Sequence, residues 1–425
     1  MKILVINSGS SSIKFQLIEI ERRASLGKGI VDRIGLKDGL FRFAPAGREA
    51  VERIADVADH RAGIAVVLEA LTDRATGIIR DPGEIDAVGH RMVLAGPSIG
   101  GPMVFDEALV RLVERHTRLA PLHNPPTLAG YRAAAEVLPA VPHVGVFDTA
   151  FYASLPARSY IYAIPYEYYE RHGIRRFGFH GMSHQYVSLR AAEALGRDPA
   201  DFRCVTCHLG NGSSIAGVKD GAPVYTSLGF GTSAGLMMGT RPGDVDPDVI
   251  LYLIDTLKMT PTEVRTLLYR NSGLKGISGI SNDLRDVERA ADAGNARAAL
   301  ALDMYAGAAA RHAAGAAVAL DGRMDALVFT AGIGENSPRM RAMIASRLGL
   351  LGVAVDPAAN AVRGVEAIVS APGAPVAVVV VPTNEELMIA LETRDAVLAV
   401  RRTGGAATPA APAPRAQTGG APTAS

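Results

Sequence analysis

The chain has 425 residues, of which 48% are hydrophobic, and a formal net charge of +1. This length exceeds what one hydrophobic core usually serves, so a globular protein with two domains is expected. A charge this close to zero, without a cluster of lysine, arginine and aromatic side chains, argues against nucleic acid and anionic membranes as partners, and no apolar run reaches the length of a bilayer.

The first 150 residues alternate short β-rich runs with longer helical patterns. Met1 to Ile20 is expected to form a hairpin, because apolar runs flank the polar tip from Asn7 to Ser12. No signal-peptide pattern precedes this hairpin, so a cytoplasmic protein is expected. The pattern then predicts, in chain order, a helix at 61–76, a strand at 87–93, helices at 106–117 and 127–137, and a strand at 143–148. Such alternation is typical of α/β organisation.

A second series follows a tyrosine- and proline-rich stretch at 150–165. It predicts a strand at 202–208, helices at 248–258 and 261–271, an alanine-rich helix at 298–320, strands near 325–330 and 374–381, and a closing helix at 385–400. The tail at 403–425 is mostly Ala, Pro, Gly and Thr and is expected to be disordered. The expected domains are 1–150 together with 385–402, and 151–384.

One polar loop occurs twice in the sequence. The stretch Asn7–Ile13 (NSGSSSI) is followed about two hundred residues later by Leu209–Ile215 (LGNGSSI), and each lies between apolar runs. Glycine lets the backbone approach a ligand, backbone amides and hydroxyls suit phosphate oxygens, and Lys14 adds a point charge. Two serine turns that arose by chance are the alternative. A duplicated domain whose two loops hold a polyphosphate explains both stretches better.

Four further motifs have competing interpretations. Ala331–Ser337 (AGIGENS) follows an apolar strand and indicates a nucleotide-binding turn or a plain strand-to-helix turn, since the third glycine of a dinucleotide fingerprint is missing. Gly231–Gly235 matches the G-x-S-x-G elbow of hydrolases, but the only later histidine, His312, lies in the alanine-rich helix. Cys204 and Cys207 are expected to be buried structural thiols rather than a redox pair or half a zinc site. His180 and His184 have the spacing of two metal ligands on a helix, but glycine stands at 181 where a zinc protease needs glutamate, so they are not expected to bind zinc.

Functional side chains also occur where apolar strands end. Arg91, Asp148 and His208 each stand at the end of such a run. Because α/β proteins place ligand sites at strand ends, these three residues are candidates for a binding site.

Assembled, these stretches resemble the acetate kinase family of carboxylate kinases, within the superfamily of actin, sugar kinases and the Hsp70 ATPase. The resemblance runs from Met1 to about Val400 and rests on VINSGSSSIKF, GHRMV, APLHNPP, VFDTAF, RRFGFHGMSH, HLGNGSS, MGTRPGDVDP, SGISNDLR, TAGIGENS and PTNEEL in this order. It implies an α/β fold of two duplicated actin-like (ribonuclease H-like) domains with a ligand cleft between them. It also implies reversible transfer of the ATP γ-phosphoryl group to acetate, Mg²⁺ with Mn²⁺ as the alternative, and a homodimer.

The resemblance further implies roles for individual residues. Arg91 and Arg241 would bind the carboxylate and the moving phosphoryl group, His180 would stabilise the transition state, and Asp148 would be the active-site carboxylate. Asn7 and Glu385 would form the magnesium site. The implied substrate site contains Arg91, Val93, Leu122, His123, Phe179 and Thr232. The implied ATP site contains Ser10, Ser12, Lys14, His208, Leu209, Gly210, Asn211, Gly212, Asp283, Leu284, Arg285, Ala331, Gly332, Ile333, Gly334 and Glu335.

Three stretches depart from the usual family pattern. Leu94-Ala95 replaces a His-containing stretch after Arg91, Tyr152 replaces a histidine, and 231–235 reads Gly-Thr-Ser-Ala-Gly instead of Thr-Pro-Leu-Glu-Gly. Since Thr232 belongs to the implied acyl pocket and one methylene is worth only about 1–3 kcal/mol there, a propionate kinase or another short-chain carboxylate kinase stays an alternative. A nucleotide-switched binding protein without a small acceptor is the alternative from another class.

Overall fold

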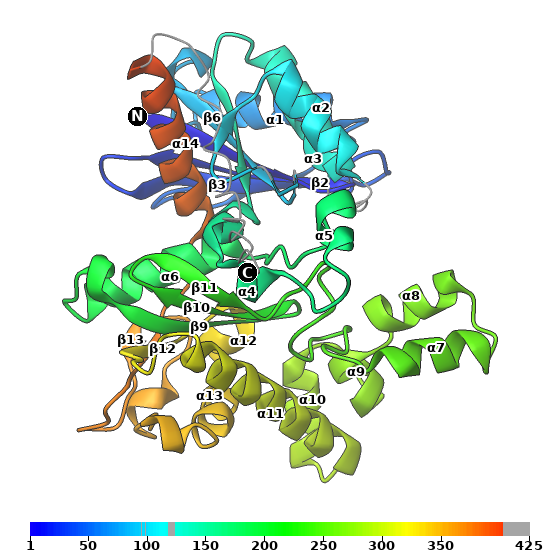
Figure 1. Ribbon diagram of the computed structural model, residues 1–425. Coiled ribbons are helices and arrows are strands. Elements are labelled where there is room, and N and C mark those ends of the chain that lie inside the picture. Colours follow the sequence, from blue (N-terminus) through cyan, green and yellow to red (C-terminus); the bar gives the residue numbers. More distant parts are fainter. Residues whose placement is uncertain (95, 98, 118–123, 403–425) are drawn as a thin grey trace, which may run out of the picture. The chain divides into compact units, whose positions relative to one another are not determined.

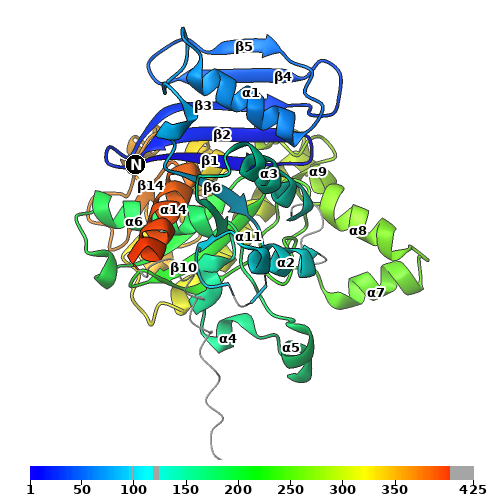
Figure 2. The same ribbon diagram turned by 90° about the horizontal axis from the view of Figure 1, so that it is seen from above.

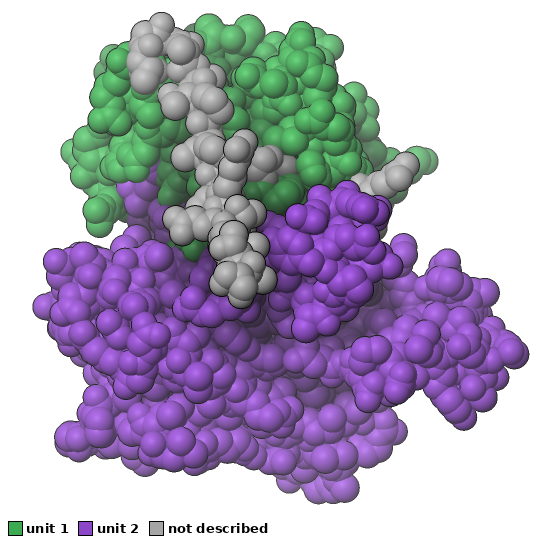
Figure 3. All heavy atoms as spheres, viewed as in Figure 1, with its two compact units in different colours: residues 1–154, 392–425 green, residues 155–391 purple. Residues whose placement is uncertain are grey.

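The computed structural model describes residues 1–402 apart from 95, 98 and 118–123. The chain forms two compact units, Met1–Ser154 with the C-terminal part from Glu392, and Leu155–Leu391, which are coloured separately in Figure 3. Among the described residues, no helix is long and apolar enough to cross a membrane.

The first unit is built on one mixed sheet with the strand order β5-β4-β3-β2-β1-β6-β8-β7. Its first two strands form the predicted hairpin, in which Ile6 pairs with Phe15. Figure 2 shows α1 and α3 lying along this sheet, and both helices pack against its central strands. The strands are β1 (Lys2–Ser8), β2 (Ser12–Glu19), β3 (Ala24–Asp32), β4 (Leu40–Pro45), β5 (Val51–Ile54), β6 (Ala87–Met92), β7 (Met103–Val104) and β8 (His143–Phe147), and the helices are α1 (His60–Thr72), α2 (Glu107–Arg115) and α3 (Asn124–Val137).

The second unit contains a sheet with the order β11-β10-β9-β12-β14-β13. The strands are β9 (Arg203–Leu209), β10 (Ser213–Lys219), β11 (Ala222–Thr226), β12 (Ala326–Thr330), β13 (Ala367–Ile368) and β14 (Ala377–Val380). The helices are α4 (Ala157–Tyr160), α5 (Glu167–His172), α6 (Gly181–Ala194), α7 (Pro247–Asp255), α8 (Pro261–Arg270), α9 (Gly273–Ser278), α10 (Leu284–Asp292), α11 (Ala296–Val318), α12 (Ala331–Asn336) and α13 (Pro338–Ala345). The closing helix α14 (Glu385–Arg402) begins in this unit and ends in the first one.

Side chains of strand β9 alternate between the two faces of this sheet. Val205, Cys207 and Leu209 belong to the apolar core that includes the alanine-rich helix α11. Because side chains alternate along a strand, Thr206 and His208 point to the opposite face, where both contact α6. The sheet therefore presents polar groups to α6 and apolar groups to α11.

The two sheets repeat one five-strand pattern. In β3-β2-β1-β6-β8 the first two pairings are antiparallel and the last two are parallel. The order β11-β10-β9-β12-β14 has the same sequence of antiparallel and parallel pairings. The repeated polar loops connect β1 to β2 and β9 to β10, at matching positions. The α/β fold with two duplicated domains is thus confirmed.

The structure also corrects some sequence-based expectations. Ala331–Ser337 was predicted as a turn, but Ala331–Asn336 forms the short helix α12, because the chain enters the helix directly from β12. Strands β3 to β5 and helix α6 were not predicted. The two cysteines are buried as expected, and burial raises the pKa of both thiols.

Candidate active site

In the first unit, Arg91 and Asp148 form an ion pair at the ends of neighbouring parallel strands. Arg91 lies near the end of β6, and Asp148 follows β8 directly, with its backbone N–H donating to the Met92 carbonyl at 2.9 Å. The Arg91 Nε and Nη2 atoms lie 3.3 and 3.1 Å from the two Asp148 carboxylate oxygens. Asp148 is only 4% exposed, so this two-point pairing compensates a buried charge and orients the Arg91 guanidinium.

The β1–β2 loop brings the predicted metal ligand and the predicted phosphate contacts together. Asn7 and Lys14 face each other across the two strands, and the Gly9 N–H donates to the Ser12 carbonyl at 2.8 Å to close the turn. Ser10 is exposed and Ser12 partly exposed. His60, which sequence reasoning missed, lies 2.8 Å from the Gly9 carbonyl through its Nε2 and supports the loop from α1.

The predicted acyl pocket is only partly described. Val93 is 9% and Phe179 4% exposed, as expected for pocket or core side chains, and they belong to different units. Leu122 and His123 lie outside the described residues. Tyr152 is fully buried.

In the second unit, two predicted histidines stack on each other. The rings of His180 and His208 lie 4.2 Å apart with an interplanar angle of 15°. His180 Nδ1 lies 2.8 Å from the Ser214 hydroxyl, and His208 Nδ1 lies 2.8 Å from the Ser183 hydroxyl. His180 precedes α6 with a left-handed φ of 57°, which turns its ring toward the sheet.

Arg241 lies beside the β9–β10 loop and His180. A Cβ atom on Gly212 would lie 3.0 Å from Arg241 Nη2 and 3.4 Å from His180 Nε2, so both side chains lie close to the backbone of this glycine. The Arg241 Nη1 donates to the Thr232 carbonyl at 2.7 Å. Burial lowers the pKa of Arg241, although a guanidinium stays charged at neutral pH. Within the described part of the chain, no carboxylate pairs with this cation.

The predicted nucleotide segments lie around the same loop. A Cβ on Gly210 would lie 3.8 Å from the Cβ of Ala331, and Asn282 donates to the Asn211 side-chain oxygen at 3.1 Å. Ala331 has a left-handed φ of 63°, and a Cβ on Gly332 would meet no atom within 4 Å. The start of α12 therefore presents open backbone near the glycine loop, as a nucleotide site requires.

The predicted residues of α10 interact mainly with one another. Asp283 caps the helix by accepting the Arg285 N–H at 2.9 Å, and it also pairs with the Arg285 side chain. These bonds lower the pKa of Asp283 to about 2. Leu284 is buried. The structure thus gives Asp283 and Leu284 structural contacts, whereas Arg285 remains largely exposed.

Arg341 and Thr383 hold the predicted nucleotide segment, to which Glu335 belongs. A Glu335 carboxylate oxygen accepts the Thr383 N–H at 3.0 Å, and Thr383 donates to Ser183, the partner of His208. Arg341 is fully buried and donates to the carbonyls of Gly334 and Glu335 at 2.9 and 3.0 Å. Sequence reasoning missed Arg341, since an arginine in a helix ordinarily indicates an exposed face.

The metal prediction rests on oxygen donors. Asn7 and Glu385 supply an amide and a carboxylate oxygen, which suit Mg²⁺, an ion that keeps several waters and takes few protein ligands. The two residues belong to different units. Across residues 1–402 as described, no group of three or more His, Cys, Asp or Glu side chains could hold a metal ion. Both ring nitrogens of His184 lie within hydrogen-bond distance of hydroxyl groups, of Thr206 and Ser214, which agrees with this absence of a metal site.

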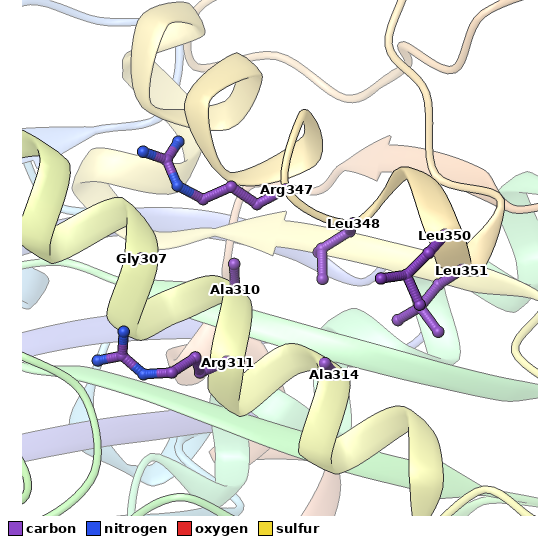
Figure 4. A pocket seen from close by; sticks show the side chains of 8 residues that line it. All are labelled: Gly307, Ala310, Arg311, Ala314, Arg347, Leu348, Leu350 and Leu351. Atoms are coloured by element: carbon purple, nitrogen blue, oxygen red, sulfur yellow. The ribbon is translucent and has the colours of Figure 1, made fainter.

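Two other features carry no part of this site. No helix begins after Ser233, so the hydrolase interpretation of Gly231–Gly235 fails. A hollow of about 330 Å³ lies between α11 and the segment Arg347–Leu351, with Arg311 and Arg347 at its edge (Figure 4). None of the predicted site residues lines it.

Comparison with known proteins gives consistent matches over nearly the whole chain. The sequence profile of the acetokinase family matches residues 2–391. The chain is 46% identical to the acetate kinase of Pseudothermotoga lettingae over 93% of its length and 98% of that protein, and 48% identical to the acetate kinase of Caldanaerobacter subterraneus over 94% and 100%. Among solved structures, it resembles the acetate kinase of Porphyromonas gingivalis (TM-score 0.88, 41% identity, 93% and 99% coverage) and a propionate kinase of Francisella tularensis (TM-score 0.85, 36% identity, 93% and 99% coverage).

Proposed function

The chain belongs to the acetokinase family, and from this premise we propose that it is an acetate kinase, which transfers the γ-phosphoryl group of ATP reversibly to acetate. One oxygen of the carboxylate attacks the γ-phosphorus, the bond to the bridging oxygen breaks, and ADP leaves while acetyl phosphate forms. Such a transfer needs little covalent help from the protein, so positioning and charge neutralisation dominate.

The observation that supports this proposal best is the position of Arg241. Its cation lies next to the glycine loop and His180, and no carboxylate of the described residues neutralises it. An uncompensated, partly buried guanidinium suits the negative oxygens of a moving phosphoryl group. Arg91, held by Asp148, would bind the carboxylate of the acceptor.

The other predicted residues would hold the nucleotide and its metal. The loop at Gly210–Gly212 and the first residues of α12, Ala331–Gly334, would offer backbone N–H groups to phosphates, and Lys14 of the first unit would add a charge. Asn7 and Glu385 would hold Mg²⁺, or Mn²⁺ in its place, and the ion would neutralise phosphate charge when bound. We also propose that the protein is cytoplasmic.

Trapping the product tests the reaction. The protein is incubated with MgATP and acetate, propionate or butyrate in the presence of hydroxylamine, which converts acyl phosphates into hydroxamates. Acethydroxamate is expected. ADP release without any hydroxamate would contradict the proposal and favour the nucleotide-switched binding protein.

A matched pair of variants tests the role of Arg241. Removing its guanidinium in Arg241→Ala should lower kcat by about 10²- to 10³-fold. Arg297→Ala is the control, because Arg297 in the same unit also donates only to backbone carbonyls, at Gly276 and Ile277. Equal activity of the two variants would refute the assigned role.

Propionate is the second candidate acceptor. The similarity to a solved propionate kinase favours it, as does the Gly-Thr-Ser-Ala-Gly loop whose Thr232 carbonyl contacts Arg241. Comparison of kcat/KM for acetate and propionate in the hydroxamate assay decides between them, since the larger value identifies the preferred acceptor.

We also propose a homodimer. Helices α7 and α8 extend from the second unit in both ribbon views, and α7 has no buried residue (Figures 1 and 2). Its Val249, Leu251 and Tyr252 are 47–55% exposed, which suits a surface covered by a second copy. Light scattering after gel filtration should give twice the chain mass, and Leu251→Asp should shift it to a monomer. A monomeric wild type would contradict the proposal.

A further inference from the structure

A buried chain of polar groups leads from His180 into the sheet. His180 Nδ1 lies 2.8 Å from the Ser214 hydroxyl, which lies 2.7 Å from His184 Nε2. His184 Nδ1 in turn lies 2.7 Å from the Thr206 hydroxyl. Ser214, His184 and Thr206 are fully buried and belong to three different elements, β10, α6 and β9. The proposed reaction gives none of these three side chains a direct role.

The distances favour one direction for the protons of this chain. The Thr206 hydroxyl lies 2.7 Å from His184 Nδ1 but 3.4 Å from the Ala216 carbonyl, and hydroxyl donors bind at about 2.5–3.0 Å. His184 Nδ1 is thus the nearer of the two possible acceptors, and we infer that Thr206 donates to it rather than to Ala216. A neutral imidazole that accepts at Nδ1 carries its proton on Nε2, so His184 donates to Ser214, and the Ser214 hydroxyl donates to His180 Nδ1.

The surroundings of His184 keep its ring neutral. Burial, assisted by the nearby His208, lowers the pKa of His184 far below its usual value. A neutral ring can be a donor at only one nitrogen, so every proton in the chain is fixed by its neighbour. A charged His184 would lack the acceptor that Thr206 needs.

We propose that Thr206, His184 and Ser214 fix His180 in the tautomer that carries its proton on Nε2. This nitrogen lies on the Gly212 side, because a Cβ there would be 3.4 Å from it and 3.0 Å from Arg241 Nη2. A second donor beside the guanidinium stabilises negative phosphoryl oxygens, whereas an unprotonated nitrogen would repel them. Thr206 and His184 are thus positioning residues. Their catalytic consequence rests on the proposed function, but the tautomer does not.

Two neighbouring side chains lie close to the His180 ring. Arg241 contributes a positive charge on the Gly212 side, and His208 stacks on the ring at 4.2 Å. Arg241 repels positive charge on this ring, so the placement of its proton by Ser214, His184 and Thr206 matters at this position.

Nuclear magnetic resonance of the ¹⁵N-histidine-labelled full chain tests the tautomer directly. Long-range ¹H–¹⁵N correlations show which ring nitrogen carries the proton, and a His180→Gln variant identifies the His180 signals. The wild type should show the proton of His180 on Nε2. Thr206→Val keeps the side-chain shape but removes the hydroxyl, so the proton should be distributed over both nitrogens, while Thr206→Ser should keep it on Nε2.

Kinetics of the same variants test the consequence. Thr206→Val should lower kcat about 10-fold with an unchanged KM for ATP, and Thr206→Ser should restore kcat. If Thr206→Val folds poorly, Ser214→Ala removes the last bond of the chain and should show the same redistribution of the proton. A wild-type His180 protonated on Nδ1, or an unchanged tautomer in both variants, would overturn the proposal. Because the spectra need no substrate, the tautomer is tested even if no acyl phosphate forms.

Discussion

Arg341 offers the sharpest test of how the predicted nucleotide segment is held. This fully buried side chain on α13 donates five hydrogen bonds, to the carbonyls of Gly334, Glu335, Asn360 and Val362 and to the Asn360 side chain, at 2.7–3.0 Å. Arg341→Met fills a similar volume with an unbranched side chain. It leaves all five acceptor positions without their donor.

The expected loss of stability follows from these acceptors. An unpaired buried acceptor costs about 1–3 kcal/mol, but water and relaxation of the loop will satisfy some of the five, so the total is about 3–5 kcal/mol. Burial lowers the pKa of Arg341 to about 10, so the wild-type side chain is charged at neutral pH. Arg341→Met removes the cost of burying this charge, which offsets part of the loss of stability. For a unit of this size, the loss corresponds to a decrease in Tm of roughly 6–20 °C.

Thermal unfolding followed by circular dichroism measures this loss, and calorimetric titration measures the Kd for ATP. Arg339→Met is the matched control two residues earlier on the same helix, because Arg339 is half-exposed and forms a surface pair with Asp292 at 2.6 Å. The control should change stability by at most about 1 kcal/mol. Arg341→Met should also weaken ATP binding, since Gly334 and Glu335 lose their support. Equal Tm values for the two variants would refute the reasoning.

Three further predictions concern other parts of the chain. Gly273→Ala should lower kcat sharply, because a Cβ there would lie 2.1 Å from the Met238 carbonyl oxygen and 2.7 Å from the Arg241 carbonyl oxygen. Gly294→Ala is the control, since Gly294 also has a positive φ but a Cβ there meets no atom within 4 Å, so kcat should stay nearly unchanged. Similar kcat values for the two variants would contradict this prediction. Burial lowers the pKa of both His90 and His143, which contact each other, so only the unfolded state gains protons below about pH 6.5. The free energy of unfolding measured in urea should therefore fall by up to about 1.4 kcal/mol per pH unit per histidine as the pH decreases from about 6.5 to about 5. His90→Leu should flatten this slope, and an identical slope in the variant would exclude the explanation. Gly332→Ala should leave Tm unchanged, since a Cβ there meets no atom within 4 Å. The same substitution should weaken ATP binding measured by calorimetric titration. An unchanged affinity for ATP would show that Gly332 does not belong to the nucleotide site.

The fold was predictable where the sequence carries strong periodicity. The hairpin at the N-terminus, the alanine-rich helix α11 and the closing helix α14 all lie where apolar spacing indicates them. The repeated polar loop identified the duplication, because it marks the same turn in both sheets. Strands β3 to β5 were missed, since their burial alternates irregularly and charged residues interrupt the apolar pattern.

The sequence proposes site residues only within recognisable motifs. Arg91, Asp148 and Arg241 stand in such stretches, whereas Arg341 and Thr206 do not, and their importance depends on contacts between elements far apart in the sequence. Ser214 belonged to the repeated loop, but nothing in the sequence indicated that its hydroxyl lies between two histidines. Sequence patterns identify groups that can contact a ligand, while the groups that orient them become visible only in three dimensions.

The most direct test of the central claim follows one oxygen atom. The protein is incubated with MgATP and acetate labelled with ¹⁸O in its carboxylate, the product is cleaved with hydroxylamine at its carbonyl carbon, and the released phosphate is analysed by mass spectrometry. Attack of the carboxylate on the γ-phosphorus predicts one ¹⁸O atom in that phosphate, together with acethydroxamate and ADP in equal amounts. Phosphate without ¹⁸O, or ADP formed without acethydroxamate, would contradict the account.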